Sequence, residues 1–218
     1  MIKNFHIRDF SHGSPTGKPK TLVLILHGYG ADGDNLSDLA EAMHESLEDP
    51  LFLIPDAPFG YEYAPTMGRQ WFSLMDRTES VLFNGAQKAY EILLKFINEK
   101  LAEYQLSYKN LVLIGFSQGA MMSIFTALKL PEQCKAVISF SGTIVSADDT
   151  IATCQSKPPV CIIHGSDDDV VHCTLGKFAA KTLKQMSLEV EFHEIPNLPH
   201  AIDLRCINIA CEFLKKIA

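Results

Sequence analysis

A serine lies between two glycines in the run Gly115-Phe116-Ser117-Gln118-Gly119, which has the G-x-S-x-G pattern. A serine hydroxyl is a weak nucleophile and has to be held clear of its neighbours. A tight turn from a strand into a helix does this, but it crowds the backbone, and residues without a Cβ relieve the crowding. The spacing therefore indicates a nucleophilic Ser117. The alternative is a glycine-rich turn that the serine merely caps.

A nucleophilic serine needs a base that takes its proton, and the base needs a carboxylate that orients it. In chains with this serine pattern, the acid and then the histidine follow the serine. Three aspartates at 167–169 follow the apolar run 160–165, and His200 follows the run 190–195. The carboxyl ends of parallel strands share one edge of a sheet, so these groups can meet there. Spacing alone leaves all three aspartates open as the acid.

Two further histidines are weaker candidates for the base. His193 lies inside the apolar run 190–195, where a structural role is expected. His172 lies only three residues after the last of the aspartates, which is too close in sequence to make it the first choice. His200 is therefore predicted to be the base.

A second glycine-rich turn, from His27 to Gly30, follows the apolar run 21–26. Acyl transfer creates an oxyanion, which backbone N–H groups stabilise from an early loop and from the residue after the nucleophile. We therefore expect the backbone amides of Tyr29 and Gln118 to form an oxyanion hole. A phosphate-cradling turn is the alternative, but the run lacks the G-x-G-x-x-G pattern and the lysine of phosphate-binding loops.

Short apolar runs rich in branched side chains predict the strands that position these residues. Most are apolar at consecutive positions, as in a sheet covered on both faces, and they lie at 21–26, 51–55, 111–115, 136–140, 160–165 and 190–195. An alternating run near 5–10 predicts an edge strand. Helical periodicity lies at 86–104, 117–130, 174–186 and 202–217. This alternation predicts one α/β domain over residues 1–218, with a mostly parallel central sheet flanked by helices.

Residues 56–80 form a long stretch without periodicity that contains the single tryptophan of the chain. Such a segment is uncommon in a compact domain and often has a function. We expect it to line or cover an acyl pocket, with Trp71, Phe72 and Leu74 as substrate-binding residues. The alternative is that its aromatic side chains only anchor a long loop on the sheet.

Composition limits the class of partner and the compartment. The 218-residue chain has a formal net charge of −7, which argues against nucleic acid as a partner because nucleic acid attracts basic surfaces. No apolar run reaches transmembrane length, and the first residues lack a signal-peptide pattern. The six cysteines form no C-x-x-C pair, so neither a disulfide framework nor a metal site is expected. These features predict a cytoplasmic protein without stable membrane insertion, metal or cofactor.

Nearly the whole chain resembles the acyl-protein thioesterase, carboxylesterase and phospholipase family of small α/β-hydrolases. The resemblance is carried by residues 26–36, 55–58, 71–72, 114–123, 164–171 and 198–202. It implies an α/β-hydrolase fold without a separate cap domain. It also implies a triad: the family pattern His-Gly-x-x-Asp, counted from His164, assigns the acid to Asp168, with Ser117 as nucleophile and His200 as base. Asp169 departs from the pattern, because many relatives have proline there.

These residues together predict a serine hydrolase that cleaves carboxylic esters or thioesters through an acyl-enzyme. Short to medium acyl esters, lysophospholipids and S-acylated proteins are all open as substrates, and the resemblance leaves a homodimer open. The main alternative is a non-catalytic ligand-binding protein on a hydrolase scaffold. A peptidase is less favoured, because amides have poor leaving groups and peptide substrates call for a large cap domain.

Overall fold

The computed structural model describes residues 7–8 and 17–217, and a seven-stranded sheet forms its centre. The strands follow the order β1-β3-β2-β6-β7-β8-β9, and all neighbours are parallel except β1 and β3. Their bounds are β1 (Ile7–Arg8), β2 (Thr21–Leu26), β3 (Pro50–Pro55), β6 (Leu111–Phe116), β7 (Ala136–Phe140), β8 (Val160–Gly165) and β9 (Val190–Ile195). The six predicted apolar strands are therefore confirmed, and β6 lies in the middle of the sheet.

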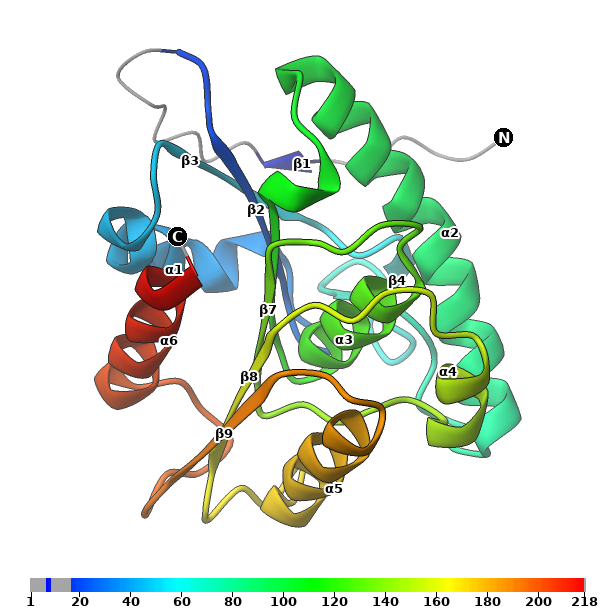
Figure 1. Ribbon diagram of the computed structural model, residues 1–218. Helices are drawn as coiled ribbons and strands as arrows, with labels where there is room; N and C mark the ends of the chain where they lie inside the picture. The colour runs from blue at the N-terminus through cyan, green and yellow to red at the C-terminus, as the bar shows by residue number, and fades with distance from the viewer. Residues whose placement is uncertain (1–6, 9–16, 218) are drawn as a thin grey trace.

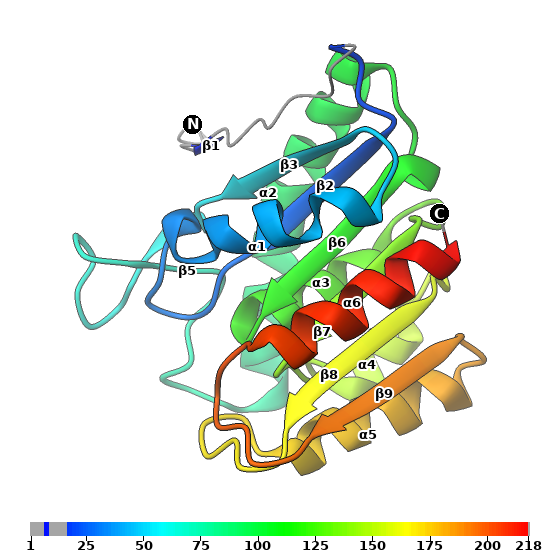
Figure 2. The same cartoon turned by 90° about the vertical axis from the view of Figure 1, so that its left-hand side faces the viewer.

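Helices cover both faces of this sheet (Figure 1 and Figure 2). One face carries α1 (Ser37–Met43) and α6 (Leu204–Ile217), and the other carries α2 (Glu79–Tyr104), α3 (Gln118–Lys129), α4 (Ala147–Ala152) and α5 (Cys173–Gln185). Three 3₁₀ turns span Gly33–Leu36, His44–Ser46 and Tyr108–Asn110, and a small antiparallel hairpin pairs β4 (Phe59–Gly60) with β5 (Arg69–Gln70). The predicted α/β layering with a mostly parallel sheet is confirmed.

The central strands are apolar at consecutive positions because each face of the sheet has its own core. In β2, Leu22, Leu24 and Leu26 belong to the core under α2, α3 and α5, whereas Val23 and Ile25 belong to the core under α1 and α6. Every residue of β2 is buried. Full burial of each large apolar side chain is worth about 1.5–3 kcal/mol, so the strands hold both helical layers in place.

Two features of the helices differ from the sequence expectation. The helix predicted at 86–104 begins at Glu79. The prediction missed its first two turns because these residues are exposed or half-buried and add no apolar periodicity. Sequence periodicity does not predict α1 and α4, which have seven and six residues and so are too short to show a repeating pattern. None of the helices in residues 7–8 and 17–217 is long and apolar enough to cross a membrane.

The edge strand expected near residues 5–10 is described only at Ile7–Arg8, which form β1 at the sheet edge beside β3. The rest of that run lies outside the described residues. The carboxyl ends of the parallel strands all point to one edge of the sheet (Figure 2). The loops that follow β2, β6, β8 and β9 therefore meet there.

Candidate active site

Ser117 occupies a strained turn between β6 and α3. Its backbone has φ 56° and ψ −118°, a left-handed φ that costs free energy for a residue with a Cβ. A Cβ on Gly119 would lie 1.9 Å from the carbonyl oxygen of Leu26, and one on Gly115 would lie 2.3 Å from the carbonyl carbon of Gly119. The two glycines of the pattern are thus required by close backbone packing, as the sequence predicts, and the packing lifts the serine out of the sheet.

Asp168 follows β8 and is buried, whereas Asp167 and Asp169 are exposed. Its Oδ1 accepts hydrogen bonds from the backbone amides of Val170 at 3.0 Å and Val171 at 2.8 Å. Burial alone would raise the pKa of Asp168, but hydrogen bonds from His200 and from the Val171 amide outweigh it and hold this pKa below its usual value. Asp168 is therefore a carboxylate at neutral pH, able to face a histidine.

His200, in the loop after β9, contacts that carboxylate with its imidazole ring. Its Nδ1–H donates to Asp168 Oδ2 at 2.7 Å, and its side chain is 15% exposed. Its ring also packs on the ring of Phe116, with centroids 4.7 Å apart. The bond at Nδ1 leaves Nε2 as the nitrogen that can take a proton from a nucleophile.

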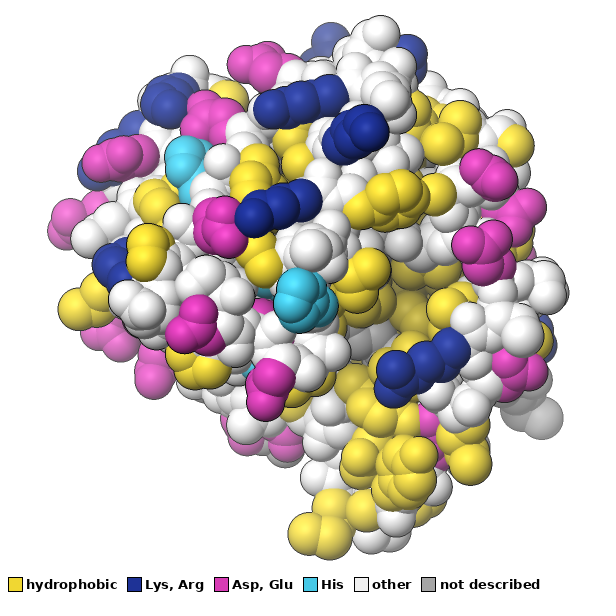
Figure 3. All heavy atoms as spheres, turned by 90° about the horizontal axis from the view of Figure 1, so that it is seen from below, with side chains coloured by type: hydrophobic (Ala, Val, Ile, Leu, Met, Phe, Trp, Pro, Cys, Tyr) yellow, Lys and Arg dark blue, Asp and Glu magenta, His cyan; other side chains and the backbone are white. Residues whose placement is uncertain are grey.

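Ser117 and His200 line the same cavity of about 650 Å³. No hydrogen bond joins their side chains in the part of the chain that the structure describes. Such bonds are often long in unliganded enzymes and tighten when substrate binds. Figure 3 looks onto this edge of the molecule and shows a hollow with hydrophobic side chains on its floor and a histidine at its rim. Much of the cavity wall is apolar, with contributions from Phe72, Leu74, Leu82, Met121, Ile144 and Val145.

The predicted oxyanion donors, Tyr29 and Gln118, line the same cavity as Ser117. Gln118 is the first residue of α3, so its N–H has no acceptor within the helix. No hydrogen bond from either backbone amide is found among the described residues. Two unengaged N–H groups at a helix N-terminus and a neighbouring turn suit a developing negative charge.

Trp71 differs from the expectation that it contacts substrate. It is fully buried and is not among the residues that line the cavity, unlike Phe72 and Leu74. Its indole N–H donates to the carbonyl oxygen of His27 at 3.0 Å, and its backbone N–H donates to Gln118 Oε1 at 2.9 Å. Trp71 therefore anchors the loop from within, whereas Phe72 and Leu74 line the cavity, and their contact with an acyl chain stays a prediction.

The Gln118 side chain is a part of the site that sequence reasoning missed. While Oε1 accepts from Trp71, Nε2 donates to the carbonyl oxygen of Phe72 at 2.8 Å. One side-chain amide thus bonds the residue after Ser117 to the loop that forms part of the cavity wall. Gln118 occupies the second variable position of the G-x-S-x-G pattern, which carries no signal that could have revealed this contact.

Two buried, neutral histidines bond to the loops of the site. His27 Nδ1–H donates to the carbonyl oxygen of Gly28 at 2.7 Å, and its Nε2 accepts from the Ala57 amide at 2.9 Å. His164 Nε2–H donates to the carbonyl oxygen of Val171 at 2.6 Å. Burial lowers the pKa of both histidines. His27 thus stabilises the turn after β2, and His164 stabilises the loop after β8 that contains Asp168.

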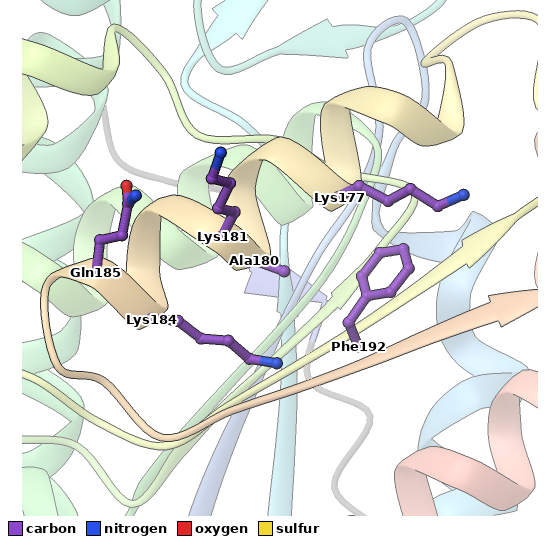
Figure 4. Close-up of a pocket in the computed structure, with 6 residues that line it drawn as sticks. All are labelled: Lys177, Ala180, Lys181, Lys184, Gln185 and Phe192. Atoms are coloured by element: carbon purple, nitrogen blue, oxygen red, sulfur yellow. The ribbon is translucent and has the colours of Figure 1, made fainter.

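The other histidines considered from sequence have structural contacts. His193 Nε2 lies 3.1 Å from Glu191 Oε2 on β9, and His172 caps the start of α5. A second, more open hollow lies between α5 and β9 (Figure 4), where Lys177, Lys184 and Phe192 are among the lining residues. It contains no candidate nucleophile beside a base. Among residues 7–8 and 17–217 no group of three or more metal-ligating side chains is found.

Comparison with known proteins points to one enzyme class. The family model described as phospholipase/carboxylesterase matches residues 10–218. Esterase YpfH of Escherichia coli strain K12 is 28% identical over 208 residues, which cover 93% of this chain and 85% of that protein. Acyl-protein thioesterase 1 of Aspergillus fumigatus is 26% identical over 222 residues, covering 92% and 89%. The crystal structure of esterase PE8 has a TM-score of 0.90 and 35% identity, covering 97% of this chain and 99% of that one.

The two neutral histidines predict that the free energy of unfolding decreases as the pH is lowered. Their pKa is lowered in the folded state, so the unfolded chain binds more protons as the pH falls below about 6.5, and the unfolding free energy decreases. Each histidine contributes at most about 1.4 kcal/mol per pH unit. Urea unfolding of His27→Gln and His164→Gln at pH 7.5, 6.5 and 5.5 is expected to show a shallower pH dependence than wild type. His193→Gln is the control, and equal slopes in all four proteins would contradict the burial argument.

Proposed function

The chain belongs to the phospholipase/carboxylesterase family, and from that membership we propose that it hydrolyses carboxylic esters or thioesters through Ser117, His200 and Asp168. Its fold is that of the α/β-hydrolases, and the enzyme class is an esterase-like hydrolase. The observation that carries the proposed mechanism is the 2.7 Å bond between Asp168 and His200 at the cavity that holds the strained serine.

In this mechanism Ser117 Oγ attacks the acyl carbon while His200 Nε2 takes its proton. The carbonyl oxygen becomes an oxyanion, which the backbone amides of Tyr29 and Gln118 stabilise. Collapse of this intermediate expels the alcohol or thiol, which receives the proton from His200. Water then attacks the acyl-enzyme with His200 as base again, and the acid and the free serine are released. Asp168 keeps the imidazole in the required tautomer and stabilises its charged form.

The apolar wall supports an acyl chain as the part of the substrate that enters the cavity. Phe72, Leu74 and Leu82 come from the loop and helix after β5, whereas Ile144 and Val145 follow β7. The volume of about 650 Å³ falls in the range typical of small-molecule sites. We therefore propose short to medium acyl esters as substrates, with lysophospholipids and S-acylated proteins as candidates for the physiological ones. The six free cysteines suit the reducing cytoplasm as the place of action.

Arg77 supports a proposal about the leaving group of the substrate. It is the one lysine or arginine among the residues that line the cavity, and no Asp or Glu lines it. Its Nε donates to the Leu74 carbonyl oxygen at 3.3 Å, and no carboxylate pairs with it in the described part of the chain. In a protein of net charge −7, this free guanidinium favours a substrate whose leaving group is anionic, such as the phosphodiester of a lysophospholipid.

The triad is tested by substitution and ester hydrolysis. Ser117→Ala and His200→Ala are each expected to lower kcat by about 10⁴ or more, because the three side chains act as a unit. Asp168→Asn is expected to cause a far larger loss than Asp167→Asn or Asp169→Asn. Rates are measured with p-nitrophenyl esters and an acyl-thioester on purified, folded protein. A variant of Ser117 or His200 that keeps a tenth of the wild-type rate would show that the assignment is wrong.

The role of Arg77 is tested with two octanoyl esters that differ in leaving-group charge, p-nitrophenyl octanoate and 4-(octanoyloxy)benzenesulfonate. Arg77→Gln is expected to lower the ratio of kcat/KM for the sulfonate to that for the neutral ester by about three- to tenfold, as for the loss of a partly exposed ionic contact. Lys184→Gln on α5 changes the net charge equally and serves as the control. An unchanged ratio in Arg77→Gln would rule out an anion contact at this position.

A further inference from the structure

The carboxylate of Glu62, in the loop between β4 and β5, accepts hydrogen bonds from four neighbouring groups. Ser73 Oγ donates to Oε2 at 2.5 Å, and Gln70 Nε2 donates to the same oxygen at 3.4 Å. The backbone N–H of Leu74 donates to Oε1 at 3.1 Å, and the Tyr29 hydroxyl donates to Oε1 as well. A half-buried carboxylate needs such donors, because losing water without them costs several kcal/mol.

These donors belong to two different parts of the site. Tyr29 lies in the turn after β2 and is a proposed oxyanion donor, whereas Leu74 lies on the apolar wall; both line the cavity. Glu62 itself does not line the cavity, so it can affect substrate only through its neighbours. The backbone N–H of Glu62 also donates to Gln70 Oε1 at 2.8 Å, which holds the glutamate in place on the β4–β5 hairpin.

The Trp71 indole joins the loop to His27 at the start of the turn after β2, and Glu62 is the side-chain link to Tyr29. The turn after β2 is also bonded to the hairpin through its backbone. The Gly30 N–H donates to the Arg69 carbonyl oxygen at 2.8 Å, and the Arg69 N–H donates to the Ala31 carbonyl oxygen at 2.9 Å. These bonds hold residues 30 and 31 but do not reach residue 29. The side chain of Tyr29 is restrained by Glu62 and by edge contact with the Tyr61 ring, at a centroid distance of 4.9 Å.

We propose that Glu62 is a positioning residue that sets the geometry of the oxyanion turn by bonding the Tyr29 side chain to the adjoining loop at residues 73–74 with one carboxylate. This proposal rests on the proposed function, because it takes the Tyr29 amide as an oxyanion donor. Glu62 holds the Tyr29 side chain from one side and the Leu74 amide from the other. A shift of the loop at residues 73–74 is thereby transmitted to residue 29. Glu62 acts on the stabilisation of the oxyanion more than on binding of the uncharged acyl chain.

The test compares two ligands of the same chain length in Glu62→Gln and wild type. The first is an octyl trifluoromethyl ketone: Ser117 Oγ adds to its carbonyl carbon, the serine proton passes to His200, and the carbonyl oxygen becomes an oxyanion. The second is 1-octanol, which fills the acyl pocket without forming an oxyanion. Glutamine keeps the shape of the side chain but replaces one acceptor oxygen with a donor that opposes the Ser73 or Tyr29 hydroxyl.

The inhibition constant of the ketone is expected to rise about tenfold or more in Glu62→Gln, whereas that of 1-octanol rises less than threefold. Glu79→Gln, at the exposed start of α2, removes the same charge and is expected to match wild type for both ligands. Equal changes for ketone and alcohol in Glu62→Gln would show a general loss of structure and overturn the positioning role. Unchanged constants for both would overturn it too.

Tyr29→Phe provides a second variant that removes only the hydroxyl and keeps the backbone amide. Because Tyr29 and Glu62 share one hydrogen bond, the double variant is expected to lose less ketone affinity than the product of the two single losses. Multiplicative losses would contradict the link. If wild type and Glu79→Gln were themselves insensitive to the ketone, the proposed serine mechanism would fail instead, which is a separate outcome.

Discussion

The site depends on the backbone contact between α3 and β2 at Gly119. With no side chain at this position, the first turn of α3 approaches the Leu26 carbonyl so closely that a Cβ would lie 1.9 Å from the oxygen. This approach forces the turn that gives Ser117 its left-handed φ and points the helix N-terminus at the serine. The proposed nucleophile, a proposed amide donor and the turn after β2 are brought together by one packing constraint rather than by three separate ones.

The remaining parts of the site are attached to that turn by polar side chains of the 56–80 segment and its partners. Gln118 bonds to the backbone of Trp71 and Phe72, and Glu62 accepts from the Tyr29 hydroxyl, the Ser73 hydroxyl and the Leu74 amide. The 56–80 segment is thus bonded to both predicted oxyanion residues. A long loop without regular periodicity gains a defined shape because its buried polar groups have specific partners.

Sequence patterns predicted the six parallel strands well, since each strand is buried on both faces and therefore apolar at consecutive positions. The sequence could nominate Ser117, Asp168 and His200 as candidates, because the ends of parallel strands converge at one edge and the family pattern selects among three aspartates. Trp71 was expected to contact substrate but is buried beneath the loop. The sequence could not separate the two roles, because aromatic residues occur both in pockets and in cores. The roles of Glu62 and Gln118 depend on hydrogen bonds between residues far apart in the chain, which no local pattern reports.

The central claim is that Ser117 is a nucleophile activated by His200, and covalent labelling tests it most directly. A fluorophosphonate that carries an alkyl chain is mixed with the protein, and the adduct is mapped by mass spectrometry of the digested peptides. The account predicts one phosphonyl group per chain, bound at Ser117, with labelling slowed about 100-fold or more in His200→Ala. Labelling at another residue, or an undiminished rate in His200→Ala, would contradict it.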